Sequence, residues 1–423
     1  MKPILLTTFL FFIVINGYAQ ETQTTKNLAL KFISYYNADQ ADSLYSLCSD
    51  EVKKSLPASN VPIVISQLKN QLGKLVSSEF ASADKGINTY ICPFEKSGPV
   101  LFLRFNQNNK LAGFNVNADN RKQVPLKDTE QPVSINTPSS VLMGTLSVPK
   151  VPGKIPVVLL IAGSGPTDRN GNSSLINGKP NYFLKISDEL YANNISVLRY
   201  DKRGIGQSTT TKSESETTFE DMVDDAVALI KHFKSDSRFS KIIVAGHSEG
   251  SLIGMIACER ANADGFISIA GAGNPIGEIM KSQYKEVLSA DNYNIVSAVL
   301  DTIKAGMPLR QQLKNGLEIQ FRPSIRPYLS SWMKYNPQTV LPELTMPILL
   351  IQGTHDIQVN VENARQLKKA KPKAKLVLID GMSHILKEAP IDRELNIATY
   401  SKDDLALHPK LVNELTQFIK EIK

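Results

Sequence analysis

The fold class that the sequence predicts is α/β, a mostly parallel sheet with helices on both faces, preceded by a small α+β domain. From residue 133 onward, short and almost wholly apolar segments alternate with helical stretches. Such segments are typical of parallel strands that are buried on both faces. Residues 21–122 instead show helical periodicity followed by short strands between turn residues. A chain of 423 residues is long enough for both domains.

The first 19 residues have the pattern of a secretory signal peptide, and we expect them to lie outside the fold. Lys2 supplies a positive start, residues 4–15 form an apolar run, and Gly17-Tyr18-Ala19 offers small residues for cleavage after Ala19. The run is too short to cross a bilayer. We therefore predict an exported protein, periplasmic or secreted, with no stable membrane insertion after cleavage. An uncleaved N-terminal anchor is the alternative.

Residues 21–122 are predicted to form the small α+β domain. Amphipathic helical patterns come first, and strand-like runs follow at 89–94, 100–105 and 111–116. Residues 118–132 are rich in charge and proline and are predicted to form a linker.

The chain has three cysteines, and two of them fall in the first domain. Because an exported protein can form disulfides, a bond between Cys48 and Cys92 stays open. Cys258 lies in a run of small and apolar residues, where a buried packing role is expected.

The net charge of +7 is spread along the chain. The densest basic cluster lies between Lys368 and Lys375, just before a predicted strand, and is typical of a solvated helix end and loop. No base-stacking or groove-reading motif accompanies the charge, so we predict no nucleic-acid partner.

Residues 133–423 are predicted to carry the parallel sheet. After a hairpin at 133–148, apolar strands are expected at 155–162, 195–200, 241–245, 265–270, 347–352 and 376–380. The interval 271–346 is mostly helical in character and interrupts the alternation. We expect it to form a helical cap over the carboxyl edge of the sheet, where ligands bind in such folds.

Ser248 is the predicted nucleophile. It lies in Gly246-His247-Ser248-Glu249-Gly250, a G-x-S-x-G motif between the strand 241–245 and a helical stretch. A serine at the tip of such a turn exposes its hydroxyl, while the glycines on either side let strand and helix pack closely. The N-terminus of the following helix favours negative charge nearby.

His384 is the predicted general base and Asp356 the carboxylate that orients it. Among the five histidines, His384 follows the last predicted strand, where reactive groups of a parallel sheet collect. Asp356 follows the preceding strand, whereas the competing Asp380 ends its own strand only four residues before His384. Ser248, Asp356 and His384 also follow the chain order of the α/β-hydrolase triad.

An oxyanion site is predicted at the end of the strand 155–162. The turn Gly163-Ser164-Gly165-Pro166 lets backbone amides approach a substrate. We expect the amides of Ser164 and Glu249 to stabilise the tetrahedral intermediate. A phosphate-binding loop is the alternative, and it is disfavoured because no Gly-Lys-Ser/Thr follows.

These motifs resemble the α/β-hydrolase superfamily, and most closely the exported bacterial esterases related to serine aminopeptidase-like (S33-type) hydrolases. The resemblance covers roughly 133–423 and rests on the elbow 246–250, the run Arg199–Ser208, and Gly353–Asp356 with Val359. Gly163–Gly171 is similar to the oxyanion segment of that subgroup, and Pro327–Met333 to an element of its cap. The resemblance implies an α/β-hydrolase fold with a helical cap.

The N-terminal region resembles, more loosely, the DUF3887 domain found ahead of such hydrolases. Leu68–Lys74 carries most of this likeness, which implies a small NTF2-like fold and no particular role. In the run Arg199–Ser208, Arg203 is expected to make a structural ion pair with a carboxylate, and Asp168 is a candidate partner; contact with the substrate is the alternative role.

The predicted function is hydrolysis of short- to medium-chain acyl esters, a small-molecule substrate, through an acyl-enzyme on Ser248 without a metal or organic cofactor. Aromatic and apolar cap residues are candidates for an acyl pocket, with simple cap packing as the alternative for each of them: Tyr284, Leu288, Tyr293, Tyr328 and Trp332. An aminopeptidase-like activity is a second hypothesis, for which Glu278, Glu286 or Glu318 would hold the amino terminus. A non-catalytic binding protein is a third, and the oligomeric state stays open.

Overall fold

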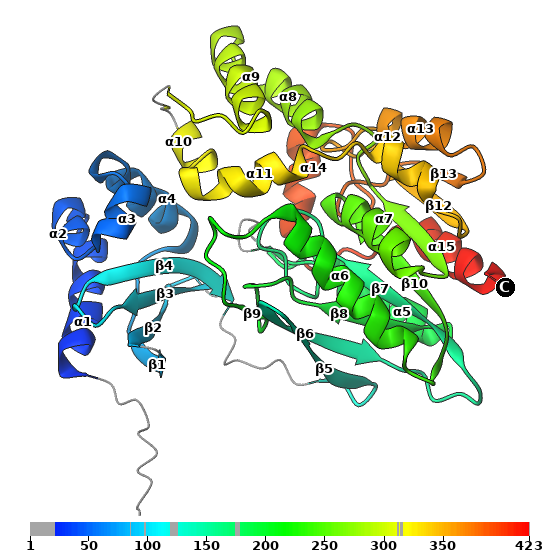
Figure 1. Ribbon diagram of the computed structural model, residues 1–423, viewed down its shortest axis with the longest axis horizontal. Coiled ribbons are helices and arrows are strands. Elements are labelled where there is room, and N and C mark those ends of the chain that lie inside the picture. The colour runs from blue at the N-terminus through cyan, green and yellow to red at the C-terminus, as the bar shows by residue number, and fades with distance from the viewer. Residues whose placement is uncertain are drawn as a thin grey trace, which may run out of the picture. The chain divides into compact units, whose positions relative to one another are not determined.

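The computed structural model describes residues 22–84, 86–96, 99–118, 126–173, 178–310, 313 and 316–422. Two compact units divide the chain, the first ending at Val116 and the second beginning at Asn117 (Figure 1). The predicted signal peptide lies outside the described residues. No helix among the described residues is both long and apolar enough to cross a membrane.

The first unit consists of helices followed by a sheet. The helical elements are α1 (Gln23–Asn37), α2 (Ala41–Ser46), α3 (Asp50–Ser55), the 3-10 turn η1 (Ala58–Asn60) and α4 (Val61–Leu72). The strands are β1 (Glu79–Asp84), β2 (Ile87–Pro93), β3 (Pro99–Phe105) and β4 (Leu111–Ala118), hydrogen-bonded in that order. The Thr22 side chain caps α1 by accepting from the Thr25 N–H, which satisfies a donor that the helix leaves unpaired.

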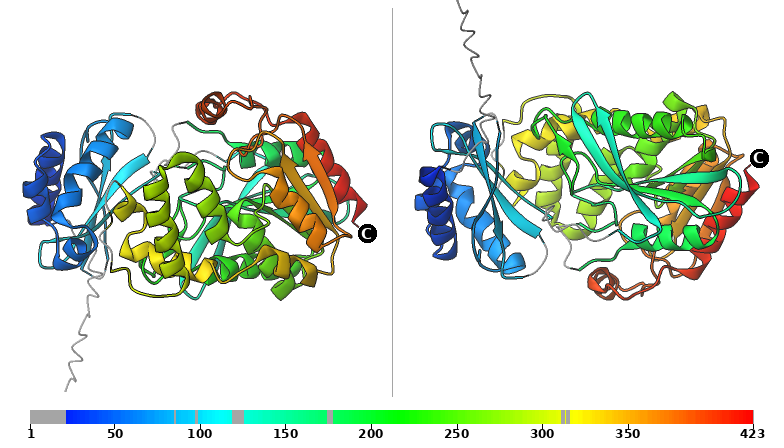
Figure 2. Two further views of the ribbon diagram at one scale, coloured as in Figure 1. Left: turned by 90° about the horizontal axis from the view of Figure 1, so that it is seen from above. Right: turned by 90° about the horizontal axis from the view of Figure 1, so that it is seen from below.

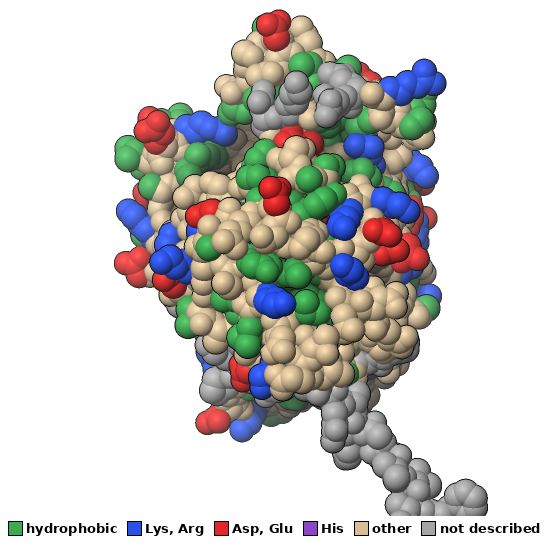
Figure 3. All heavy atoms as spheres, turned by 90° about the vertical axis from the view of Figure 1, so that its left-hand side faces the viewer, with side chains coloured by type: hydrophobic (Ala, Val, Ile, Leu, Met, Phe, Trp, Pro, Cys, Tyr) green, Lys and Arg blue, Asp and Glu red, His purple; other side chains and the backbone are tan. Residues whose placement is uncertain are grey.

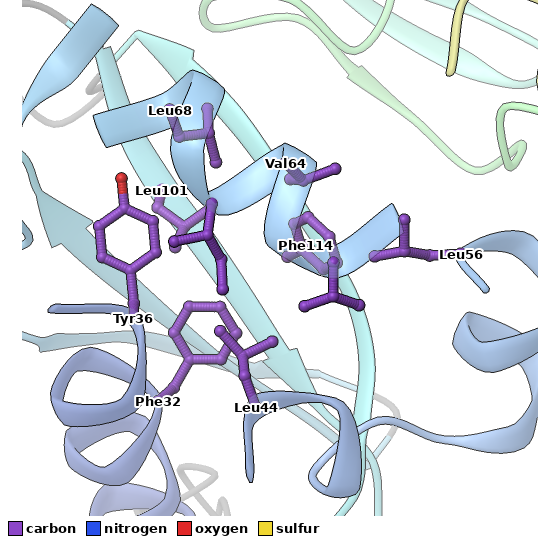
Figure 4. Close-up of a pocket in the computed structure, with 10 residues that line it drawn as sticks. Phe32, Tyr36, Leu44, Leu56, Val64, Leu68, Leu101 and Phe114 are labelled. Carbon is purple, nitrogen blue, oxygen red and sulfur yellow. The ribbon is translucent and has the colours of Figure 1, made fainter. Parts of the chain in front are cut away.

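The helices cover one face of this sheet and enclose a small apolar cavity (Figure 4). Its lining comprises Phe32, Tyr36, Leu44, Leu56, Val61, Val64, Ile65, Leu68, Leu101 and Phe114. The Tyr36 hydroxyl donates to the carbonyl of Gly73 at 3.1 Å, so its polar atom is paired within the unit.

Cys48 and Cys92 are buried and unpaired, so the disulfide left open by the sequence is not formed. Burial raises the pKa of Cys48 to about 11 and that of Cys92 to about 12. Both thiols therefore stay protonated at neutral pH and are poor nucleophiles. Cys258 is buried and free, as expected for a packing residue.

The second unit is built on one large sheet, and each of the six predicted apolar strands is present. Its strands are β5 (Glu130–Thr137), β6 (Ser140–Ser147), β7 (Ile155–Ile161), β8 (Ser196–Tyr200), β9 (Thr209–Thr210), β10 (Phe239–His247), β11 (Gly265–Ile269), β12 (Ile348–Gly353) and β13 (Lys375–Ile379). The order is β13-β12-β11-β10-β7-β8-β6-β5, and β9 pairs with β6. Strands β13 to β8 run parallel, whereas β6 pairs antiparallel with β8 and β5.

Strand β5 begins at Glu130, inside the stretch predicted to be a linker. Proline lacks the N–H that a central strand needs and is tolerated in an edge strand. Since β5 ends the sheet order, Pro132 fits there. Because residues 118–132 are rich in charge and proline, the sequence predicted a linker there and missed that β5 begins at Glu130.

Helices cover both faces of the large sheet (Figure 2). The helices α6 (Phe219–Lys234) and α7 (Glu249–Ala261) contribute to the core on one face, and α5 (Tyr182–Ala192) and α15 (Pro409–Glu421) to the core on the other. Helices α13 (Val361–Ala370) and α14 (Arg393–Ala398) follow β12 and β13. The predicted α/β-hydrolase fold class is therefore confirmed.

The interval between β11 and β12 is helical. It contains α8 (Ile276–Val287), α9 (Ala290–Lys304), α10 (Leu317–Gln320), η2 (Pro323–Ile325), α11 (Arg326–Trp332), α12 (Pro337–Val340) and η3 (Leu341–Glu343). Trp332 stacks on Phe219 of α6, with ring centroids 5.7 Å apart and an interplanar angle of 2°. Since Trp332 is only 8% exposed, it packs the cap onto α6 and does not line an open acyl pocket.

Charged side chains of both signs are interspersed on the face of the molecule that Figure 3 shows. The net charge of +7 is therefore not gathered on that face.

Candidate active site

Ser248 occupies the turn between β10 and α7 in a conformation that non-glycine residues rarely adopt. Its φ of 55° and ψ of −120° lie outside the helical and extended regions, and such strain typically marks a functional position. A Cβ at Gly246 would overlap the carbonyl oxygen of Gly250, and a Cβ at Gly250 would overlap that of Ile161. Both glycines are thus required by close backbone approach, which explains the motif.

His384 and Asp356 lie side by side at the carboxyl edge of the sheet. The Nδ1 atom of His384 donates to Oδ2 of Asp356 at 2.8 Å. Both residues are buried, at 5% and 7% exposure. Asp380 is exposed and instead accepts a hydrogen bond from the Thr354 hydroxyl at 2.9 Å. The carboxylate beside His384 is therefore Asp356 and not Asp380.

Asp356 is held as a carboxylate by four donors. Besides His384, its Oδ1 accepts from the N–H groups of Gln358 and Val359 at 2.8 and 2.9 Å, and its Oδ2 accepts from Gln352 Nε2 at 2.9 Å. Burial raises the pKa of Asp356, but the charge and hydrogen bond of His384 and the two N–H groups lower it below its ordinary value. The carboxylate thus stays ionised, and its partners fix its orientation.

His247, the residue before Ser248, ties the elbow to the His384 loop. Its Nε2 donates to the backbone carbonyl of His384 at 2.8 Å, and the two rings lie 4.8 Å apart. The sequence suggested only that this side chain points away from the nucleophile. Nothing in the sequence indicates its contact with a loop 137 residues further along the chain.

Ser248 Oγ and His384 form no hydrogen bond among the described residues. Catalytic hydrogen bonds are often long in the absence of substrate and tighten when it binds. The structure therefore brings Ser248, His384 and Asp356 to one edge of the sheet, with the His384–Asp356 pair already formed.

Burial of His247 is expected to make the folding stability of the protein decrease at acidic pH. Burial, then the neighbouring His384, lower the pKa of His247 to about 3. Within the described part of the chain the buried Nδ1 atom has no hydrogen-bond partner, so a proton there would be unpaired. An unfolded histidine takes up its proton near pH 6.5, so between about pH 6.5 and 3 the unfolded chain binds more protons and stability falls as the pH falls.

We expect His247→Gln to remove this acid sensitivity, because glutamine keeps an N–H donor and does not titrate. Between pH 7 and 4.5, the wild type should lose about 2–3 kcal/mol more unfolding free energy than the variant. Urea unfolding at several pH values measures this difference. The matched control is His232→Gln at an exposed position. Its unfolding free energy should change with pH as that of the wild type does. Equal slopes for His247→Gln and wild type would contradict the assignment.

The predicted oxyanion turn lies against the elbow. A Cβ added to Gly163 would lie 3.1 Å from the Cβ of Ser248, a tight contact that would push the turn and the elbow apart by a few tenths of an ångström. Ser164 follows it and is exposed. The N–H of Glu249 belongs to the first turn of α7, where backbone donors have no partner within the helix. Glu249 directly follows Ser248, and Ser164 directly follows Gly163, which packs against Ser248. Both predicted oxyanion donors therefore belong to segments next to the nucleophile.

Arg203 makes the structural ion pair expected of it, but Asp168 was the wrong partner. Its guanidinium pairs with Asp225 at 2.6 Å and with Asp221 at 3.1 Å, both on α6. Asp168 instead accepts from the N–H groups of Asn170 and Asn172 in its own loop. The sequence could not reveal this choice because it depends on how α6 packs against the turn after β8.

The fold and these residues define an α/β-hydrolase with a strained serine elbow and a buried His–Asp pair. Residues 179–321 match the family model described as serine aminopeptidase, S33, and residues 29–114 match the protein family of unknown function DUF3887. The predicted resemblance to S33-type hydrolases and to DUF3887 is therefore confirmed. The second unit has an α/β-hydrolase fold and is similar to the S33 serine aminopeptidases over part of its length, and the first unit is similar to DUF3887.

Esterase EstD of Thermotoga maritima is similar to this chain over almost its whole length. The two are 25% identical over 399 residues, which cover 90% of this chain and 91% of EstD. Among solved structures, Est1E of Butyrivibrio proteoclasticus with bound ferulic acid is 16% identical, with a TM-score of 0.45 over 68% of this chain and 96% of that one. Pyrococcus furiosus esterase Pf2001 is 18% identical, with a TM-score of 0.43 over 69% and 92%.

Proposed function

We propose that this chain is a serine carboxylesterase that cleaves short- to medium-chain acyl esters through an acyl-enzyme on Ser248. One observation carries the proposal. The strained elbow places the half-buried Ser248 at the sheet edge where His384 donates to the buried Asp356 at 2.8 Å. This is the arrangement that activates a serine hydroxyl as a nucleophile.

In the proposed mechanism, His384 acts as the base when the ester is bound. Its Nδ1–H is held by Asp356, so the free Nε2 atom accepts the proton as Ser248 Oγ attacks the carbonyl carbon. The N–H groups of Ser164 and Glu249 stabilise the oxyanion, each contributing about 3–4 kcal/mol in the transition state. His384 then returns the proton to the leaving alcohol, and a water activated by His384 releases the acid.

Ester rather than peptide cleavage is supported by the whole-length similarity to Esterase EstD. The S33 description of the family model keeps an aminopeptidase as the second candidate. That activity needs a cap carboxylate free to bind an amino terminus. Glu286 lies 3.7 Å from Arg393, which offsets its charge. Glu318 has a buried Oε2 without a hydrogen-bond partner among the described residues. It is therefore a stronger candidate than Glu286 for binding an amino terminus.

The proposed location is outside the cytoplasm, periplasmic or secreted. The support is the pattern at residues 1–19, a positive start, an apolar run and a small-residue cleavage site. N-terminal sequencing of the protein from an expressing cell fraction tests this proposal, and a mature start at Gln20 is expected.

Comparing two kinds of chromogenic substrate tests the proposed activity. We expect the full-length protein to hydrolyse p-nitrophenyl acetate and butyrate with a kcat/KM at least about 100-fold above that for amino-acid p-nitroanilides, because an amide needs a protonated leaving group and a bound amino terminus. Glu318→Gln is the matched variant and should leave ester turnover unchanged. Nitroanilide turnover without ester turnover, abolished by Glu318→Gln, would establish the peptidase instead.

A further inference from the structure

A buried lysine that the proposed mechanism does not use lies beside the elbow. Lys202 follows β8, and its Nζ atom donates to the backbone carbonyl of Gly163 at 2.6 Å. The same Nζ lies 3.6 Å from Oε2 of Glu249, and the two side chains are only 7% and 1% exposed. Tyr328 of the cap helix α11 donates to the other carboxylate oxygen of Glu249 at 2.7 Å.

We propose that Lys202 is a positioning residue of the oxyanion site, which holds the Gly163–Ser164 peptide so that the Ser164 N–H faces the carbonyl attacked by Ser248. The inference rests on the proposed function, because it assigns a role within that same site. Lys202 acts through the peptide and does not touch the substrate.

The geometry of the peptide bond gives Lys202 this role. In a trans peptide the C=O and the following N–H point in opposite directions. Binding of the Gly163 carbonyl by Lys202 therefore fixes the peptide so that the Ser164 N–H points in the opposite direction, away from Lys202. Gly163 has no side chain that packing could hold, and a Cβ there would come within 3.1 Å of Ser248. A charge-assisted hydrogen bond supplies the restraint that packing cannot.

Lys202 has a second effect, because its positive charge lies near the carboxylate of Glu249. The carboxylate of Glu249 belongs to the residue next to the nucleophile, and it would oppose the negative charge that develops on the substrate oxygen. Lys202 offsets this charge. Burial lowers the pKa of Lys202 below its ordinary value, and the charge and hydrogen bond of Glu249 oppose this shift.

A lysine can also bind loop carbonyls for stability alone, and the same chain contains an example. Lys371 Nζ donates to the carbonyls of Pro342 and Leu344 at 2.8 and 2.7 Å. These two carbonyls lie before β12, at the opposite end of that strand from Asp356. Lys371→Met is therefore a matched control that removes the same kind of hydrogen bond at a distance from the site.

A double-mutant cycle tests the role of Lys202. The full-length wild type, Lys202→Met, Glu249→Gln, the double variant and Lys371→Met are compared. The main readout is the second-order rate of labelling by a fluorophosphonate, because it probes the oxyanion site whatever the natural substrate. The kcat and KM for p-nitrophenyl butyrate, the Ki of a trifluoromethyl ketone and the Tm are measured alongside.

We expect Lys202→Met to lower the labelling rate and kcat by about 10- to 100-fold, less than the roughly 100- to 1000-fold loss typical when an oxyanion donor itself is removed, because the Ser164 N–H is displaced and not deleted. The KM should stay within about threefold, and the Ki of the ketone should rise by a factor similar to the loss in kcat. The double variant should stay impaired, because the Gly163 carbonyl still lacks its donor. Lys371→Met should lower the Tm without changing the labelling rate.

Two results would overturn the inference. If the double variant regains wild-type labelling, Lys202 only neutralises Glu249. If Lys202→Met lowers the Tm but labels at the wild-type rate, its role is structural, like that of Lys371. Failure of the wild type itself to label or to hydrolyse esters would instead refute the proposed function, so the two failures are distinguishable.

Discussion

Replacing Ser248 by alanine is expected to lower kcat for p-nitrophenyl butyrate by about 10⁶-fold, the loss typical when the nucleophile of a serine hydrolase is removed. Fluorophosphonate labelling should disappear with it. The variant should still fold, because alanine has a Cβ like serine and experiences the same strain at φ 55°. Labelling followed by gel fluorescence, with circular dichroism to check folding, measures both effects.

Ser251 provides a matched control for this experiment. It lies one turn further along α7, is fully buried, and its hydroxyl is 2.7 Å from that of Ser268. Ser251→Ala should therefore label like the wild type. Equal labelling of Ser248→Ala and wild type would rule out Ser248 as the nucleophile. A wild type that neither labels nor hydrolyses any substrate would favour the non-catalytic binding protein.

Asp356→Asn is expected to lower kcat by about 10⁴-fold while leaving the fold intact. The Oδ1 of Asp356 accepts two backbone N–H groups, so an asparagine must place its own oxygen there. Its NH₂ group would then face His384 Nδ1, which donates to Asp356 Oδ2 in the wild type. Two donors cannot bind each other, so His384 is driven to the tautomer with the proton on Nε2, which cannot accept the proton of Ser248.

Asp380→Asn is the matched control for this substitution. Asp380 is exposed and accepts from the Thr354 hydroxyl, a bond that the oxygen of asparagine can keep. Its kcat should stay within about twofold of the wild type, since surface substitutions are usually close to neutral. If Asp380→Asn proves as damaging as Asp356→Asn, the carboxylate that orients His384 has been assigned wrongly.

Much of the fold follows from local sequence. Continuous apolar runs indicate strands buried on both faces, and all six of the predicted runs lie in the large sheet. The prediction was weaker at β5, where a proline and charged residues suggested a linker. Edge strands have one unpaired side and tolerate such residues, so local composition does not distinguish them from loops.

The sequence by itself determined which residues are available for the chemistry. Ser248, Asp356 and His384 each lie within four residues of the end of a predicted strand, and parallel strands bring their carboxyl ends to one edge. The close packing at Gly246 and Gly250 is likewise encoded in the motif, because only glycine fits where a Cβ would meet a backbone carbonyl.

Only the tertiary structure decided which side chains support these residues. His247 donates a hydrogen bond to the backbone carbonyl of His384. Arg203 forms its ion pair with Asp225 and not with Asp168. Lys202 donates to the carbonyl of Gly163. Each of these contacts joins residues from different parts of the chain, at sequence separations from 22 to 137 residues. Hydrogen bonds depend on distances and directions that only packing sets, and local periodicity carries no information about them.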